Sequence, residues 1–183
     1  MKIREDYLIN EKTVLLTGEY DCNGKLITRV IDGEETFLVD LTPSQVIDAN
    51  LLLVGSNLRG SLNSSKNLLG NLYMYPLTIN SRLGIYLLPT KSLKKRDCIW
   101  FSLIHIKNMQ CLGIKKTRVQ TTYGHIVEID MRKSAFINRI QIAKELREMI
   151  IKNSGSSLMN YFESQKGFYI SADSNRNKYT FVK

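Results

Sequence analysis

Residues 84–106, GIYLLPTKSLKKRDCIWFSLIHI, contain two apolar runs separated by a short basic loop. The first run covers residues 85–88, and Pro89 ends it because proline has no N–H to donate to a strand ladder. The second run covers residues 98–106, and in an extended chain both of its faces are mostly apolar. This pattern predicts a strand that is covered on both sides, near the middle of the fold.

The segments around this centre favour further strands joined by tight turns. Asp32-Gly33 separates two strand-like runs and is a strong hairpin signal. Polar segments rich in glycine, serine and asparagine are typical of loops. The predicted elements are strands at 7–16, 25–31, 35–41 and 71–79, a loop at 55–70, and a hairpin at 111–130 with its turn near Tyr123-Gly124.

Two segments have helical signals. Thr42-Pro43 combines an N-cap residue with proline at the first helical position, which predicts a short helix near residues 43–53. From Ser134, which can cap a helix, apolar residues recur every three and four positions over about five turns. The cluster 153–157, NSGSS, ends this helix. The fold class is therefore α+β: a β-rich, mostly antiparallel sheet core with one long C-terminal amphipathic helix and a short helix near residues 43–53.

The length of 183 residues predicts one domain with a tail. We expect residues 1–152 to form the core domain. Residues 153–183, polar with scattered aromatics, form a tail that either docks or orders on a partner. The sequence has no apolar run near 18 residues and no signal peptide, and its three cysteines form no CxxC pair. These features predict a cytoplasmic protein with reduced cysteines and no membrane contact.

The net charge of +9 is unevenly distributed. Residues 1–48 have a net charge of −5, whereas residues 49–127 have eleven Lys and Arg against a single acid, Asp97. One acid in 79 consecutive residues is hard to explain by solubility, which mixed charges serve equally well. A concentrated positive field predicts a polyanionic partner, most often a nucleic acid.

Catalytic and cofactor motifs are weak. GSNLRGSL, from Gly55, has two glycines but lacks the Lys-Ser/Thr pair of a phosphate-binding loop. Cys98 and His105 lie seven positions apart, so on one strand they point to opposite faces and cannot form a thiol–imidazole pair directly. We therefore expect no enzyme activity, no metal and no cofactor.

No zinc-finger spacing, basic zipper or aromatic RNA-binding box is present, and the cations fall on predicted loops and hairpins. That placement suits contact with the DNA backbone and minor groove, where arginine and lysine read width and negative potential. The predicted DNA-binding residues are all eleven cations of residues 49–127: Arg59, Lys66, Arg82, Lys91, Lys94, Lys95, Arg96, Lys107, Lys115, Lys116 and Arg118.

The central segment resembles the competence transcription factor family ComK, whose members have a pattern like Pro-Thr-x-Ser-x5-Cys-x-Trp-x-Ser-x2-His-Ile/Val. The upstream Gly55-Ser56 and Gly60 resemble the Gly-Ser-rich segment of that family. The central pattern is met by Pro89, Thr90, Ser92, Cys98, Trp100, Ser102, His105 and Ile106.

The resemblance implies a transcriptional activator of DNA-uptake genes that binds paired A/T-rich boxes, largely through the minor groove, as a dimer or tetramer. It also implies contact with RNA polymerase and control by a MecA-type adaptor with a Clp protease. Ser61 stands where the family often has an arginine. The tail has Phe168-Tyr169-Ile170-Ser171-Ala172 where the family has a Phe-Met-Leu-Tyr-Pro-like adaptor motif. Phe168, Tyr169 and Ile170 are the predicted partner-binding residues.

Two alternatives remain open at the level of sequence. A binder of RNA or single strands needs exposed aromatics among the cations, and Tyr73, Tyr75 and Tyr123 are the candidates. A cytosolic enzyme would use Cys98 or a histidine as its reactive group.

Overall fold

The computed structural model describes residues 3–93, 95–154, 167–173 and 176–182. By its internal contacts the chain divides into two compact units, Met1–Ile151 and Lys152–Lys183. None of the helices in the described residues is long and apolar enough to cross a membrane.

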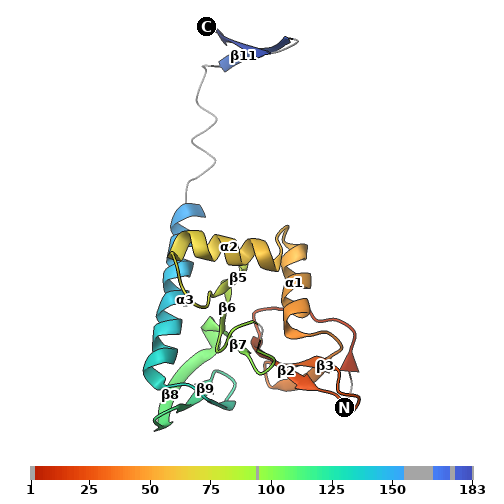
Figure 1. Cartoon of the computed structure of the whole chain (residues 1–183), viewed down its shortest axis with the longest axis vertical. Helices are drawn as coiled ribbons and strands as arrows, with labels where there is room; N and C mark the ends of the chain where they lie inside the picture. Colours follow the sequence, from red (N-terminus) through yellow and green to blue (C-terminus); the bar gives the residue numbers. More distant parts are fainter. Residues whose placement is uncertain (1–2, 94, 155–166, 174–175, 183) are drawn as a thin grey trace. The chain divides into compact units, whose positions relative to one another are not determined.

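The first unit is built on a seven-stranded sheet with strand order β1-β4-β3-β2-β7-β6-β5 and a three-stranded sheet with order β10-β9-β8 (Figure 1). The large sheet is antiparallel except for the pairing of β1 with β4, so the α+β, mostly antiparallel fold is confirmed. The elements are β1 Ile3–Arg4, β2 Thr13–Tyr20, β3 Leu26–Asp32, β4 Glu35–Val39, α1 Pro43–Leu53, α2 Leu58–Leu69, β5 Leu77–Asn80, β6 Ile85–Pro89, β7 Ile99–Ser102, a 3-10 turn Leu103–His105, β8 Ile106–Gly113, β9 Lys116–Thr121, β10 Ile126–Ile129 and α3 Lys133–Ser154.

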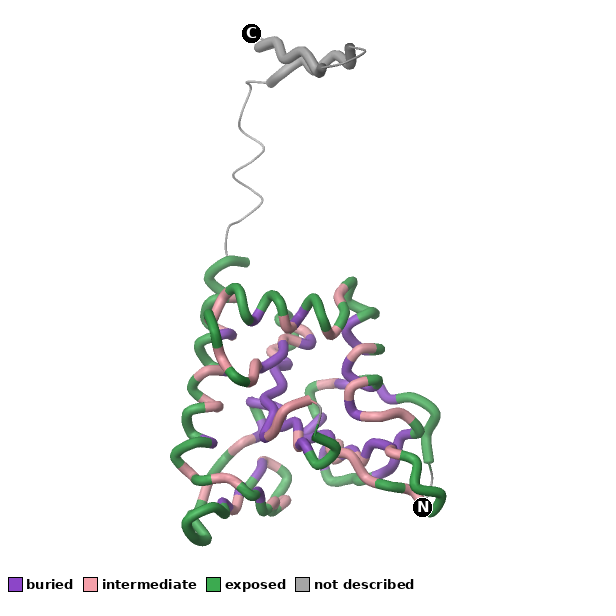
Figure 2. The backbone as a smooth tube through the Cα atoms, viewed as in Figure 1, coloured by how far each residue is buried: buried purple, intermediate pink, exposed green. Residues whose placement is uncertain are grey.

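The strand β7 lies inside the large sheet, paired with β2 on one side and β6 on the other. Its side chains alternate between two apolar cores. Trp100 packs in the core under α1 and α2, and Phe101 packs in the core under α3 and the small sheet. Figure 2 shows the buried residues concentrated in these central strands. The prediction of a strand covered on both faces is confirmed for Ile99–Ser102.

The helix α1 begins as predicted. Thr42 is its N-cap, Pro43 is the first helical residue, and Gln45 completes a capping box with Thr42. Val46, Ile47 and Leu51 are buried against the large sheet.

The long helix α3 covers the opposite core through Phe136, Ala143 and Leu146. The Phe136 ring meets the Phe101 ring edge to face, with 5.4 Å between the ring centres. The prediction that Ser134 caps this helix is wrong. The helix begins at Lys133, and the Phe136 N–H donates to the carbonyl of Arg132.

The predicted loop at 55–70 is wrong, because residues 58–69 form α2. Asn57 caps the helix by accepting from the N–H of Gly60, and the Ser65 hydroxyl donates to the carbonyl of Pro76. Small residues let the helix approach the sheet, so tertiary contact outweighs the low helix propensity of serine, asparagine and glycine.

Two predicted strands are shorter or shifted. The strand predicted at 7–16 is β2, Thr13–Tyr20, because the Asn10 side chain forms a local turn with Lys12. The strand predicted at 71–79 is only Leu77–Asn80, because Tyr75 bonds back to the carbonyl of Gly70.

The apolar run at 98–106 is not one strand. After Ser102 the chain makes the 3-10 turn and enters the small sheet as β8. Residues 111–113 therefore belong to β8, and Lys115 lies in the β8–β9 turn, so the predicted hairpin at 111–130 is β9 and β10 only. The turns near Asp32-Gly33 and Tyr123-Gly124 are confirmed.

His105 connects the 3-10 turn to distant loops. One ring nitrogen lies 2.7 Å from the carbonyl of Glu11, and the other lies 2.7 Å from the hydroxyl of Thr122. Burial lowers the pKa of the imidazole below its ordinary 6.5.

We expect this histidine to destabilise the fold in acid. A depressed pKa means that the unfolded state binds the proton more readily, so stability is full above pH 6.5 and falls as the pH drops through the folded pKa. Urea unfolding at pH 7.5 and pH 5.5 measures the loss. His105→Gln should lower stability at pH 7.5 but flatten this part of the profile, and an unchanged profile would contradict the assignment.

The second unit contains an antiparallel hairpin of β11 Gly167–Asp173 and β12 Arg176–Val182. Phe168, Tyr169 and Ile170 lie on β11. Their side chains lie outside the described residues.

Candidate nucleic-acid interface

The eleven predicted DNA-binding cations lie on three parts of the first unit. We call these the α2 group, the basic loop and the hairpin group. Their members are Arg59, Lys66 and Arg82; Lys91, Lys94, Lys95 and Arg96; and Lys107, Lys115, Lys116 and Arg118.

The base of the basic loop is fixed by residues next to it. The N–H of Thr90 donates to the carbonyl of Ile99, and the N–H of Ile99 donates to the hydroxyl of Thr90, each over 2.9 Å. The Cys98 thiol donates to the carbonyl of Lys91 over 3.1 Å. Leu93 packs against the core under α1 and α2. The two sides of the loop are therefore held together.

The cations of the loop differ in their surroundings. Lys91 forms an ion pair with Asp97, which raises the pKa of the lysine and lowers that of the carboxyl. Arg96 donates to the hydroxyl of Tyr20 and lies over its ring. Lys95 is exposed, whereas Lys94 lies outside the described residues. Asp97 is the sequence neighbour of Arg96, but its carboxylate pairs with Lys91 across the loop.

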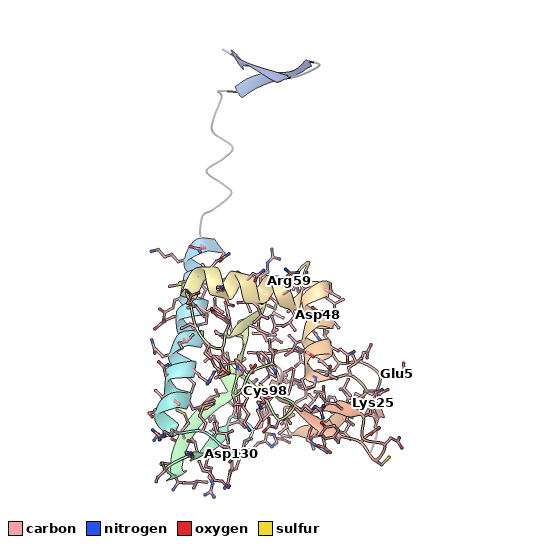
Figure 3. The ribbon with its side chains drawn as sticks, in the orientation of Figure 1. Glu5, Lys25, Asp48, Arg59, Cys98 and Asp130 are labelled. Carbon is pink, nitrogen blue, oxygen red and sulfur yellow. The ribbon has the colours of Figure 1, made fainter. Side chains whose placement is uncertain are left out.

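The α2 group lies at the other end of β6. Arg59 and Lys66 are exposed on α2, and Arg82 is exposed in the turn between β5 and β6. Figure 3 shows Arg59 on the outer side of α2, with Asp48 of α1 nearby. The basic loop follows β6 and Arg82 precedes it, so the five residues of that strand, roughly 17 Å, separate them.

The hairpin group lies on the small sheet. Lys107, Lys115 and Lys116 are exposed on β8, on the β8–β9 turn and at the start of β9. Arg118 is ion-paired with Glu128 on the neighbouring strand at 2.9 Å. The described cations therefore lie on three parts of the first unit, and Lys91 of the basic loop lines the same pocket as Glu128, the ion-pair partner of Arg118.

Two residues that hold the basic loop had no signal in the sequence. Tyr20 contacts Arg96 from 76 positions away, and Gly18 lies on the same strand directly beneath the loop. A side chain at Gly18 would clash with the carbonyl oxygen of Arg96.

The reactive residues of the alternative enzyme interpretation have structural contacts. Cys98 is buried, and burial raises the pKa of its thiol, which disfavours the nucleophilic thiolate. His105 bonds to Glu11 and Thr122, and His125 bonds to the carbonyl of Gly33. Among the described residues, no cluster of histidine, cysteine and acidic side chains could hold a metal ion.

The three tyrosines that a single-strand binder would use for stacking differ in how free their rings are. The hydroxyl of Tyr75 is bonded to Gly70 and Leu72, and the ring of Tyr123 lies against His105 with 5.6 Å between ring centres. Only Tyr73 of these three is widely exposed, at 87%.

Comparison with known proteins decides the family. The family described as ComK protein matches residues 4–155, most of the chain. The chain belongs to the ComK family. A competence transcription factor of Bacillus subtilis (strain 168) is 24% identical over 143 residues, which are 78% of this chain and 74% of that protein. No solved structure is significantly similar to this chain.

The residues that suggested ComK from sequence are mostly buried. Thr90, Cys98, Trp100, Ser102 and His105 all lie in the interior. Figure 3 shows Cys98 in the interior of the first unit. In this ComK family chain the central pattern therefore builds the middle of the sheet and closes the base of the basic loop.

Proposed function

We propose that this ComK family protein is a transcriptional activator of competence genes that binds A/T-rich double-stranded DNA, largely through the minor groove. The observation that carries the proposal is the charge of residues 49–127. Their one acid, Asp97, is ion-paired with Lys91, so the exposed cations of this region act without a competing carboxylate from within it. The similarity to a competence transcription factor supports a role in transcription.

The basic loop is suited to a narrow groove. Its base is closed by hydrogen bonds, so little conformational entropy is lost when it binds. Exposed cations on such a loop are attracted by the strong negative potential of the A/T minor groove. Lys107, Lys115 and Lys116 on the small sheet, and Arg59, Lys66 and Arg82 at the α2 end, would contact phosphates.

Binding should be strongly salt-dependent. If roughly six phosphates are neutralised, the slope of log affinity against log salt should be about −5. A gel-shift titration between low and physiological salt, with single strands and RNA as competitors, measures this. A flat salt profile, or better competition by RNA than by the duplex, would contradict the proposal.

The proposed partners are a second copy of this chain, as a dimer or tetramer on DNA, RNA polymerase, and a MecA-type adaptor with a Clp protease, all in the cytoplasm. Phe168, Tyr169 and Ile170 are the proposed adaptor contacts. The support is the position of this segment in the second compact unit, on a β-hairpin that is separate in sequence from all eleven cations.

Truncation after Gly155 should therefore leave DNA affinity within about threefold. The first compact unit contains all eleven cations, and the removed residues are nearly balanced in charge. Activation or adaptor-dependent proteolysis should fall. DNA affinity is measured by gel shift, and proteolysis is followed with purified adaptor and protease. A tenfold loss of affinity in a folded truncated protein would overturn this division of roles.

Binding to RNA or single-stranded nucleic acid is the second candidate. Tyr73 favours it, because an exposed ring next to α2 could stack on an unpaired base. Tyr73→Ala distinguishes the two functions. If the ring stacks on an unpaired base, the variant should bind single strands more weakly and the duplex as before. If the protein binds only the duplex, the variant should leave affinity for both unchanged.

A further inference from the structure

A groove of about 640 Å³ lies between α2 and the turn that joins β5 to β6, with Ile150 of α3 at one side. The residues that line it and matter for its chemistry are Ser61, Ser64, Thr78, Asn80 and Arg82. Its volume falls within the range of small-molecule sites, which run from about 300 to 1,000 Å³.

One hydroxyl of this groove, that of Thr78, is buried without a hydrogen-bond partner in the described chain. Burying a hydroxyl without a partner is costly, so this unpaired hydroxyl indicates a ligand that completes it. Ser61, which is 6% exposed, lines the groove beside it and adds a second hydroxyl to the lining. By contrast, the neighbouring Ser65 donates to the carbonyl of Pro76.

Asn80 and Arg82 add donors to the same groove. The side-chain oxygen of Asn80 accepts the N–H groups of Arg82 and Leu83, at 3.1 and 3.2 Å. This orientation leaves the Asn80 amide nitrogen as an available donor. The guanidinium of Arg82 is the one charged side chain that lines the groove in the described structure.

The nearby chain has no carboxylate of its own. Residues 49–96 contain no Asp or Glu, so both walls that come from α2 and from the β5–β6 turn are without negative charge. The first N–H groups of α2 already have partners. The N–H of Leu58 donates to the carboxylate of Asp48, and the N–H of Gly60 donates to the side-chain oxygen of Asn57.

We propose that this groove binds a phosphate group through Ser61, Thr78, Asn80 and Arg82. Hydroxyl and amide donors around one guanidinium suit an anion with several acceptor oxygens. The same chemistry could come from a DNA backbone phosphate, which rests on the proposed function, or from a small phosphorylated molecule such as a nucleotide. The volume is large enough for a phosphate together with an attached sugar and base.

Equilibrium dialysis of the full chain tests the small-molecule source, with inorganic phosphate and adenosine monophosphate as probes. The variants are Ser61→Ala and Arg82→Ser, and Lys12→Ser is the control because Lys12 is an exposed cation in the acidic N-terminal part. Ser61→Ala removes a hydroxyl from the lining of the groove without changing the charge. Binding should weaken about fivefold or more in Ser61→Ala and at least tenfold in Arg82→Ser, and stay unchanged in Lys12→Ser.

Gel shifts with an A/T-rich duplex test the other source. If the phosphate belongs to DNA, dialysis shows no binding of either probe, Ser61→Ala and Arg82→Ser both weaken duplex binding, and Arg82→Ser flattens the salt slope by about one unit. If neither arm responds to Ser61→Ala and Arg82→Ser, the site does not exist. If the wild type binds no DNA at all, the proposed function fails, while the dialysis result still decides whether the groove binds phosphate.

Discussion

Replacing Lys94, Lys95 and Arg96 by serine is expected to weaken binding to an A/T-rich duplex at least tenfold. It should also flatten the salt slope by about two to three units, because each lost cation leaves one phosphate un-neutralised. The fold should survive, since exposed loop charges seldom contribute more than a few tenths of a kcal/mol. Gel-shift titrations at several salt concentrations measure both quantities, and thermal unfolding checks the fold.

The control variant replaces three cations elsewhere, at Lys12, Arg132 and Lys144, which are exposed and belong to none of the three groups. Arg4 is unsuitable as a control, because its guanidinium lies 3.4 Å from the centre of the Phe37 ring and pairs with Glu35. The control should lose less than threefold in affinity. Equal losses in both triple variants would mean that only net charge matters and that the basic loop has no special role.

Gly18→Val is expected to lower both stability and DNA affinity, although valine is favoured in strands. Gly18 lies on β2, one residue beyond Thr17, the last residue of the strand that pairs with β7, and an added Cβ would clash with the carbonyl oxygen of Arg96. Either the strand or the basic loop must move. We expect a cost of about 1–3 kcal/mol, as for other overpacked sites. We also expect at least a fivefold loss of duplex affinity, because the loop is displaced.

Thr17→Val is the matched control, since it places valine one position earlier on the same strand. It should change stability and affinity little. Urea unfolding and gel shift measure the two properties. A fully stable Gly18→Val protein with normal affinity would show that DNA binding does not depend on the close contact between the basic loop and β2.

Short sequence signals correctly predicted two central strands, one hairpin turn and the start of one helix. The apolar residues 85–88 and 99–102 form paired central strands, Asp32-Gly33 is at a hairpin turn, and Thr42-Pro43 begins a helix. In each case the information lies within a few residues of the element.

The helix α2 could not be predicted by the same means. Its sequence, LRGSLNSSKNLL, is full of residues that disfavour helices in isolation. The face of the helix that carries small residues packs against the chain at the start of β5, as the hydrogen bond from the Ser65 hydroxyl to the carbonyl of Pro76 shows. Asn57, followed by leucines four residues apart at Leu58 and Leu62, was the one local signal of this helix.

The contacts that hold the basic loop were hidden for a similar reason. Arg96 bonds to Tyr20, far away in the sequence, so no local pattern could pair them. Asp97 lies next to Arg96 in sequence but reaches Lys91 across the loop. The sequence predicted that the basic loop joins two central strands, but not which partners hold each cation.

The most direct test of DNA binding by this ComK family chain compares matched A/T-rich and G/C-rich duplexes in the presence and absence of a minor-groove drug. Arginine and lysine enter the narrow, strongly negative A/T minor groove, and the drug occupies the same space. Minor-groove recognition predicts at least tenfold tighter binding to the A/T-rich duplex and displacement of the protein by the drug. Equal affinity for both duplexes, or binding that the drug does not affect, would contradict it.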